Sequence, residues 1–136
     1  MNSIKEEIEG LYYKIAILDR KYKKQFIKSI PSDFALNVNT IICMDEHLSS
    51  EFSFEDIYYA KLSSKSDFVL FYNFEILFRP EYRFDLMSFI KEKSKSRKFA
   101  IIWPGEVRDQ QLIYSRPGRV DYYAHKIDNY LIYKEQ

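Results

Sequence analysis

The stretch KIAILDRKYKKQFIKSI, residues 14–30, decides the fold of this chain. It opens with a short apolar run at residues 14–18, which predicts a buried strand, and continues at residues 22–30 with apolar side chains at helical spacing. Two later runs, DFVLF at 67–71 and FAIIW at 99–103, are apolar throughout, as strands covered on both faces are. Because helical patterns separate these runs, the sequence predicts an α/β fold with a mainly parallel sheet and helices on both faces.

The remaining segments complete a single predicted domain, residues 1–136. Helices are expected at the N-terminus (Ile4, Ile8, Leu11 and Tyr12 on one face), at residues 53–63, and around Leu86, Phe89 and Ile90. A further strand is expected within residues 34–44. The last third is Tyr-rich and broken by turn residues, which predicts short β segments at 111–114, 120–125 and 130–133. The predicted domain is therefore a three-layer, P-loop-NTPase-like arrangement of a sheet between two layers of helices, with a β-rich C-terminal part.

Composition limits the classes of function. The 136 residues carry a formal net charge of +1, so the chain has no overall field that would attract nucleic acid or membrane, although local clusters can still do so. The single cysteine, Cys43, has no partner for an intramolecular disulfide and fits a reducing compartment. No run approaches the ~20 apolar residues of a membrane span. We expect a cytoplasmic protein that does not contact membranes.

The junction after the first strand is informative. In P-loop NTPases this turn supplies glycines and a Lys-Ser/Thr pair that surround a phosphate. Here it reads Asp19-Arg20-Lys21, and the three glycines of the chain, Gly10, Gly105 and Gly118, all lie elsewhere. Backbone amides cannot surround a phosphate without residues that tolerate close approach and positive φ. The sequence therefore predicts a P-loop-like scaffold with a degenerate phosphate site.

The second nucleotide-handling position is also altered. A Walker-B strand ends in an aspartate that reaches Mg²⁺, and Tyr72 occupies that position after the run at 67–71. A phenol does not replace a carboxylate as ligand for a hard cation. Glu75 is either a remnant acid or, more commonly for such a residue, a surface carboxylate. We expect no catalytic residues.

The remaining cofactor candidates are weak. Lys21, Lys23 and Lys24, in a basic run that begins at Arg20, could bind phosphate as point charges, or could form a solvated helix face. His47 and His125 stand far apart in the sequence and do not make a metal pattern. We expect neither a cofactor nor a metal.

Two segments are candidates for partner binding. Trp103, before Pro104-Gly105, is either a stacking platform or partner anchor, or packs over the sheet edge. The segment from Tyr114 to Tyr123 interleaves two arginines with three tyrosines and suits either single-stranded nucleic acid or a protein interface. Its candidate residues are Arg116, Arg119, Tyr122 and Tyr123.

Taken in order, four short motifs resemble the BrxF family, small P-loop proteins of the BREX bacteriophage exclusion systems. They are LNVN at 36–39, NFEILF at 73–78, WPGE at 103–106, and LIY at 112–114 followed by Pro117-Gly118 and Tyr122. The resemblance covers roughly Leu36 to Tyr123. The chain departs from the family pattern at the Walker-A turn, at Tyr72, and at Arg119, where the family has His.

The resemblance implies membership of a multi-protein defence assembly. We therefore expect a pseudo-NTPase that acts as a non-catalytic subunit or adaptor and binds larger defence proteins, with possible nucleic-acid contact within the complex and possible homo-oligomers. Two alternatives stay open. One is a nucleic-acid-binding accessory protein that uses the Arg/Lys and Tyr loops, and the other is a nucleotide-binding ATPase with an atypical phosphate loop.

Overall fold

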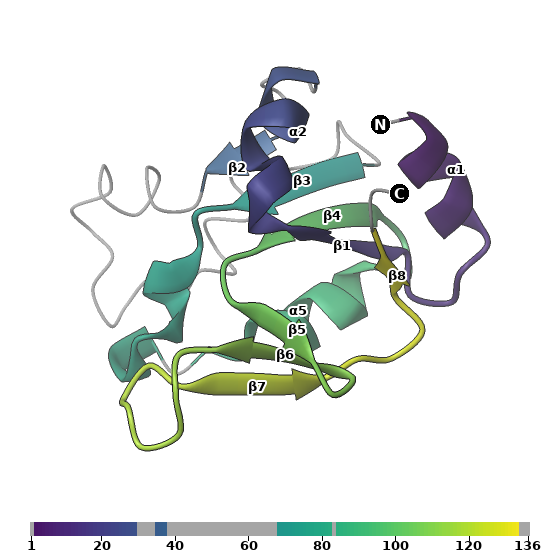
Figure 1. Ribbon diagram of the computed structural model, residues 1–136. Helices are drawn as coiled ribbons and strands as arrows, with labels where there is room; N and C mark the ends of the chain where they lie inside the picture. Colours follow the sequence, from purple (N-terminus) through teal and green to yellow (C-terminus); the bar gives the residue numbers. More distant parts are fainter. Residues whose placement is uncertain (1, 30–34, 38–67, 83, 134–136) are drawn as a thin grey trace.

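The structure is a computed structural model that describes residues 2–29, 35–37, 68–82 and 84–133. These residues form a five-stranded sheet in the order β2-β3-β4-β1-β8 and a smaller sheet in the order β5-β6-β7 (Figure 1). Every pairing in the larger sheet is parallel, and both pairings in the smaller sheet are antiparallel. The expected α/β class with a mainly parallel sheet is confirmed.

Three strands form the centre of the larger sheet: β1 (Ile15–Asp19), β3 (Phe68–Tyr72) and β4 (Lys98–Trp103). Successive side chains point to opposite faces of a strand. In β1, Ile15 and Ile17 join one buried cluster, whereas Ala16 and Leu18 join the other. The same alternation runs through β3 and β4, which explains why all three strands are apolar at nearly every position.

Helices cover both faces of this sheet. On one face lie α1 (Asn2–Glu9) and α2 (Lys23–Ser29), and on the other lies α5 (Leu86–Lys93). The chain from β1 to β2 (Ala35–Asn37) crosses the sheet in one direction, and the chain from β3 to β4 crosses in the opposite direction. Because such crossovers are right-handed, α2 and α5 must lie on opposite faces.

The smaller sheet covers the same face as α5. It consists of β5 (Glu106–Arg108), β6 (Gln111–Tyr114) and β7 (Tyr123–Lys126). A two-residue turn, Asp109-Gln110, joins β5 to β6 with φ values of 53° and 59°, as a type I′ hairpin requires. Leu112 of β6 is fully buried against the larger sheet. The chain then returns as β8 (Leu131–Ile132) beside β1.

Several expected elements differ in detail. The junction after β1 contains a 3₁₀ helix, η1 (Arg20–Tyr22), before α2 begins. Further 3₁₀ helices, η3 (Glu75–Phe78) and η4 (Pro80–Tyr82), and strand β5 were not expected. Strand β7 begins at Tyr123 instead of residue 120. The predicted helix at 53–63, and Cys43 and His47, lie outside the described residues.

A close approach fixes the smaller sheet to the end of β4. Trp103 is 1% exposed, and its indole Nε1 donates a hydrogen bond to the carbonyl oxygen of Ile113 at 3.0 Å. Gly105 passes the same segment, and a Cβ at this position would overlap the Ile113 carbonyl oxygen and lie 3.1 Å from the Cα of Tyr114. Only glycine allows this contact between the two backbones.

Gly105→Ala should therefore destabilise the fold. Backbone must move to admit the methyl group, which we expect to cost about 2 kcal/mol or more and to lower Tm by about 4 °C for each kcal/mol. Gly10→Ala is the matched control, because a Cβ at Gly10 meets no atom within 4 Å. Equal Tm values for the two variants, measured by thermal unfolding, would contradict the close approach.

Candidate functional site

A pocket of about 350 Å³ opens at the carboxyl ends of the central strands. Parallel sheets commonly bind ligands at this edge, because loops from several strands meet there. Arg20 and Lys23 follow β1, and Asn73 and Glu75 follow β3. The walls are completed by Pro104, after β4, and Tyr114, on β6. Residues that follow β1 and residues that follow β3 thus line one pocket.

The junction between β1 and α2 contains a carboxylate, that of Asp19, which bonds to the backbone of the turn. The carboxylate of Asp19 accepts a hydrogen bond from the backbone N–H of Lys21 at 2.9 Å and so caps η1. Tyr22, at the end of η1, is buried. The turn is therefore a short capped helix closed over an aromatic side chain, whereas a phosphate loop is an open ring of amides.

The lysine that points into the pocket also has a partner. Lys23 Nζ donates a hydrogen bond to Oδ1 of Asn73 across the pocket. Asn73 has a φ of 55°, in the left-handed region, which asparagine tolerates better than most residues. A left-handed residue directly after β3 turns the chain so that the amide oxygen of Asn73 faces the end of β1.

The pKa of Tyr114 is raised by its surroundings in the pocket. Burial is the largest cause that raises the pKa of its phenol, and the negative charges of Asp121 and Glu75 raise this pKa further. The Tyr114 ring stacks on Phe78 with centroids 4.7 Å apart, so the ring is held in one orientation. Tyr114 therefore presents a neutral hydroxyl on a fixed ring.

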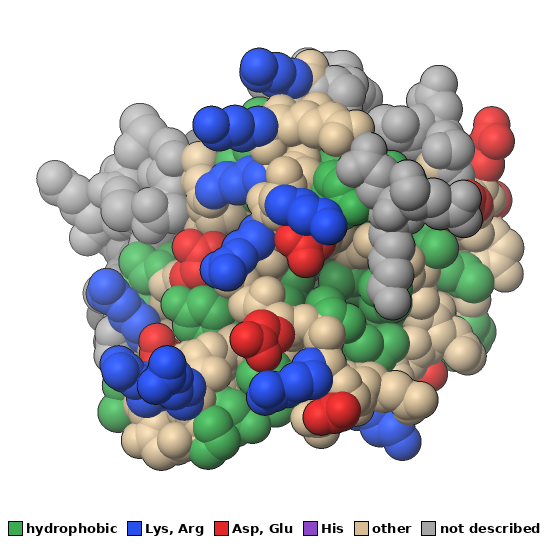
Figure 2. Space-filling view, viewed as in Figure 1, with side chains coloured by type: hydrophobic (Ala, Val, Ile, Leu, Met, Phe, Trp, Pro, Cys, Tyr) green, Lys and Arg blue, Asp and Glu red, His purple; other side chains and the backbone are tan. Residues whose placement is uncertain are grey.

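A second cavity, of about 480 Å³, adjoins the first and shares Arg20, Pro104 and Tyr114 with it. Its far wall is the loop between β6 and β7, which contributes Arg116 and Tyr122 among other residues. We refer to the two cavities together as the strand-end groove. Figure 2 shows Lys and Arg side chains in a band over α2 and the strand ends, with more at the loop between β6 and β7.

The structure sorts the expected site residues into three groups. Lys23, Glu75, Arg116 and Tyr122 line the strand-end groove. Exposed positions outside the groove lining are occupied by Lys21, Lys24 and Arg119. The third group is Trp103 and Tyr123, which belong to the packing beneath.

The burial of Trp103 corrects the expectation that it could be a surface anchor, and Tyr123 is half-buried with its hydroxyl engaged. Trp103 packs against Phe74, Phe78 and Tyr123 in the core and is not available to a partner on the surface. The Tyr123 hydroxyl donates to Asp85 at 2.6 Å and accepts from the backbone N–H of Met87 at 3.1 Å. Its position therefore ties β7 to the start of α5.

The groove also contains residues that were not named as site residues, although Arg20 lies in the expected basic run and Tyr114 in the expected Arg-Tyr segment. Arg20, Asn73 and Tyr114 each line it, and Asn73 and Tyr114 are central to its geometry. The position of Arg20 and Asn73 directly after apolar strands was the available signal, because strand ends of a parallel sheet meet at one edge. Tyr114 comes from the smaller sheet, whose placement no local pattern predicts.

Tyr72, which the sequence pattern placed where a Walker-B aspartate is expected, ends β3 beside Asn37 of β2. Its ring is half-buried and packs against the cluster that includes Leu18 and Ile102, on the face covered by α1 and α2. The side chain thus contributes apolar contact at the carboxyl end of β3.

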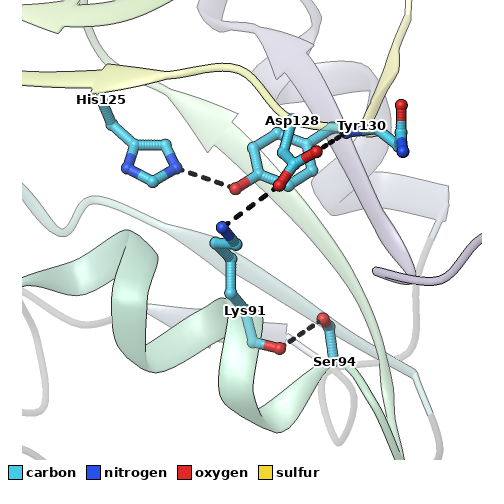
Figure 3. A network of polar contacts seen from close by, with 6 residues as sticks. Lys91, Ser94, His125, Asp128 and Tyr130 are labelled. Carbon is cyan, nitrogen blue, oxygen red and sulfur yellow. Dashed lines mark hydrogen bonds and ion pairs between the residues drawn. The ribbon is translucent and has the colours of Figure 1, made fainter.

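A second polar cluster lies away from the groove, on the α5 side (Figure 3). His125 Nε2 and the Tyr130 hydroxyl are 2.8 Å apart, and Lys91 Nζ lies 3.3 Å from Asp128 Oδ2. The Ser94 hydroxyl donates to the carbonyl oxygen of Lys91 at 2.8 Å. These polar groups are paired with one another, so the cluster holds β7 and the segment before β8 against α5.

Compared with known proteins, the chain matches no family model, no curated protein and no solved structure. The described residues contain no group of three His, Cys, Asp or Glu side chains that could hold a metal ion. Within the same residues, none of the helices combines the length and the apolar character that crossing a bilayer requires.

His125 should make stability depend on pH. Burial, the largest cause, lowers the pKa of this imidazole, and Lys91 lowers it too, whereas Asp85 and Asp128 act in the opposite direction. A histidine with a lowered folded pKa contributes stability that is complete above its unfolded pKa of about 6.5 and is lost as the pH falls below it. Wild-type Tm should therefore fall between pH 7.5 and 5.5 by about 2 °C more than that of His125→Gln. Parallel Tm curves for the two proteins would show that His125 is not responsible.

Proposed function

We propose that this chain is a non-catalytic subunit or adaptor of a prokaryotic anti-phage assembly of the BREX type, built on a degenerate P-loop-like scaffold. One observation carries the proposal. The residues after β1 and after β3 line a single pocket, as a Walker-A turn and a Walker-B strand end must in order to hold Mg-nucleotide together.

The side chains at these positions are committed to other contacts. Asp19 places a carboxylate on the turn where a triphosphate would need amides and positive charge. Lys23 is hydrogen-bonded to Asn73, and Tyr72 packs against apolar side chains. Nucleotide binding would require all three contacts to be rearranged, which supports a scaffold that no longer hydrolyses nucleotide.

An adaptor needs an exposed surface that a partner can bury. The tip of the loop between β6 and β7 offers one, because Val120 is 82% exposed beside Arg119, and neither residue lines the groove. An exposed apolar side chain next to an arginine is a common feature of protein interfaces. We assign this tip, Arg119-Val120, to contact with a larger defence protein.

Mg-ATP should leave the thermal stability of the chain unchanged. A ligand at 100 times its Kd raises the free energy of unfolding by about 2.7 kcal/mol, so a working site with micromolar affinity would raise Tm by several degrees at about 2 mM nucleotide. We expect no measurable shift with Mg-ATP or Mg-GTP. A shift that disappears in Lys23→Gln would instead establish a nucleotide-binding protein with an atypical phosphate site.

Co-expression with the products of neighbouring genes should yield a stable complex. We expect Val120→Asp to weaken copurification at least tenfold, because a charge would be buried at the centre of the contact. Tyr12→Asp is the matched control, since Tyr12 is 67% exposed and lies beside α1. A chain that copurifies with none of these products would contradict the adaptor role.

A further inference from the structure

We propose that the strand-end groove binds single-stranded nucleic acid, with Arg20 and Arg116 on the phosphates and Tyr122 against a base. This site goes beyond the adaptor role and does not depend on it. The proposal rests on residues that line the groove and on basic side chains near it, and its test uses the isolated chain.

The charges of the groove leave Arg20 and Arg116 available. Glu106 pairs with Arg108 at 3.6 Å, and Asp121 accepts a hydrogen bond from Ser115 Oγ at 2.7 Å. Neither Arg20 nor Arg116 forms an ion pair with a residue that the structure describes. The groove is lined by four basic side chains, Arg20, Lys23, Arg108 and Arg116, and by three acids, Glu75, Glu106 and Asp121, so its net charge is positive by one.

Arg20 is held at the point where the two cavities meet. Its Nη1 lies 3.4 Å from the carbonyl oxygen of Pro104, and its side chain lines both cavities. Arg116 lines the far wall of the larger cavity. Guanidinium groups bind phosphate oxygens through two parallel hydrogen bonds, so this pair can hold phosphates at separate points along the groove.

Aromatic rings lie between and beside these charges. Tyr122 is 39% exposed and lines the larger cavity, and Tyr114 lines both cavities with its ring supported by Phe78. Bases stack on such rings without regard to sequence, and proteins that bind single strands combine them with a basic groove. An acidic peptide would satisfy the arginines but would leave the rings without this contact.

The basic surface is longer than the groove. Exposed Lys24 and Lys28 belong to α2, and exposed Arg119 belongs to the loop between β6 and β7. Figure 2 shows Lys and Arg side chains over both segments. A free nucleotide would not reach these side chains, whereas a chain of phosphates would. The recessed position of Tyr114 favours a single strand, because the bases of a duplex are paired and stacked inside it.

Fluorescence anisotropy with labelled oligo(dT) of about 15 nucleotides, at low salt, tests the site. We expect binding that weakens steeply with salt, and a salt slope that falls by about 1.4 when Arg20→Gln and Arg116→Gln are combined. Arg116→Gln alone should weaken binding about fivefold or more, and Tyr122→Ser should do the same. Lys126→Gln, an equal change of charge at an exposed position on β7 outside the groove, should change it less than twofold.

Three results would overturn the proposal, once Tm values show that the variants are folded. One is the absence of binding at low salt, and another is an equal loss of affinity in Arg116→Gln and Lys126→Gln. The third is tighter binding of duplex DNA, or of a poly-glutamate peptide, than of oligo(dT). Each of these leaves the copurification and Mg-ATP results unaffected, so failure of the groove and failure of the adaptor role can be told apart.

Discussion

Burial of the three central strands on both faces is the constraint on which the rest of the structure depends. Strands β1, β3 and β4 carry apolar side chains that point alternately into two clusters, and neither cluster can be left open to water. Helices α1 and α2 cover one face. The other face is too wide for α5 alone, and the smaller sheet completes its cover through Leu112 and Tyr123. The antiparallel part of the chain is thus a structural necessity, and its loops reach the carboxyl edge as a consequence.

The carboxyl edge of the larger sheet brings together residues that lie far apart in the sequence. Side chains after β1 and β3 meet there because strand order and register bring them together whatever their identity. The Asp19 carboxylate caps the turn after β1, and the hydrogen bond between Lys23 and Asn73 links this turn region to the end of β3. A phosphate bound at this turn would compete with Asp19 for the amide of Lys21 and with Asn73 for the lysine.

Much of this could be predicted from the sequence, and the rest could not for identifiable reasons. The apolar runs around Ile17, Leu70 and Ile101 are continuous enough to indicate central strands, and the absence of glycine from residues 19–21 argued against a phosphate-binding loop at that turn. The burial of Trp103 was not predictable, because it depends on a smaller sheet whose strands are too short to show an alternation of apolar and polar residues. The bond between Lys23 and Asn73 likewise depends on a left-handed residue and on two strands brought together by the fold.

The near-zero net charge of the chain hides an uneven distribution of charge over its surface. A formal charge of +1 excludes a strong overall field, but it does not describe how charge is distributed. Among the described residues, α1 exposes Glu6, Glu7 and Glu9, whereas the exposed charges of α2 are lysines. Charge that is separated in this way can orient the molecule toward an anionic partner. It does not raise the affinity for every polyanion, because charge–charge interactions beyond about 10 Å are screened at physiological salt. A local basic groove on a neutral protein therefore acts mainly on anionic ligands that come close to it.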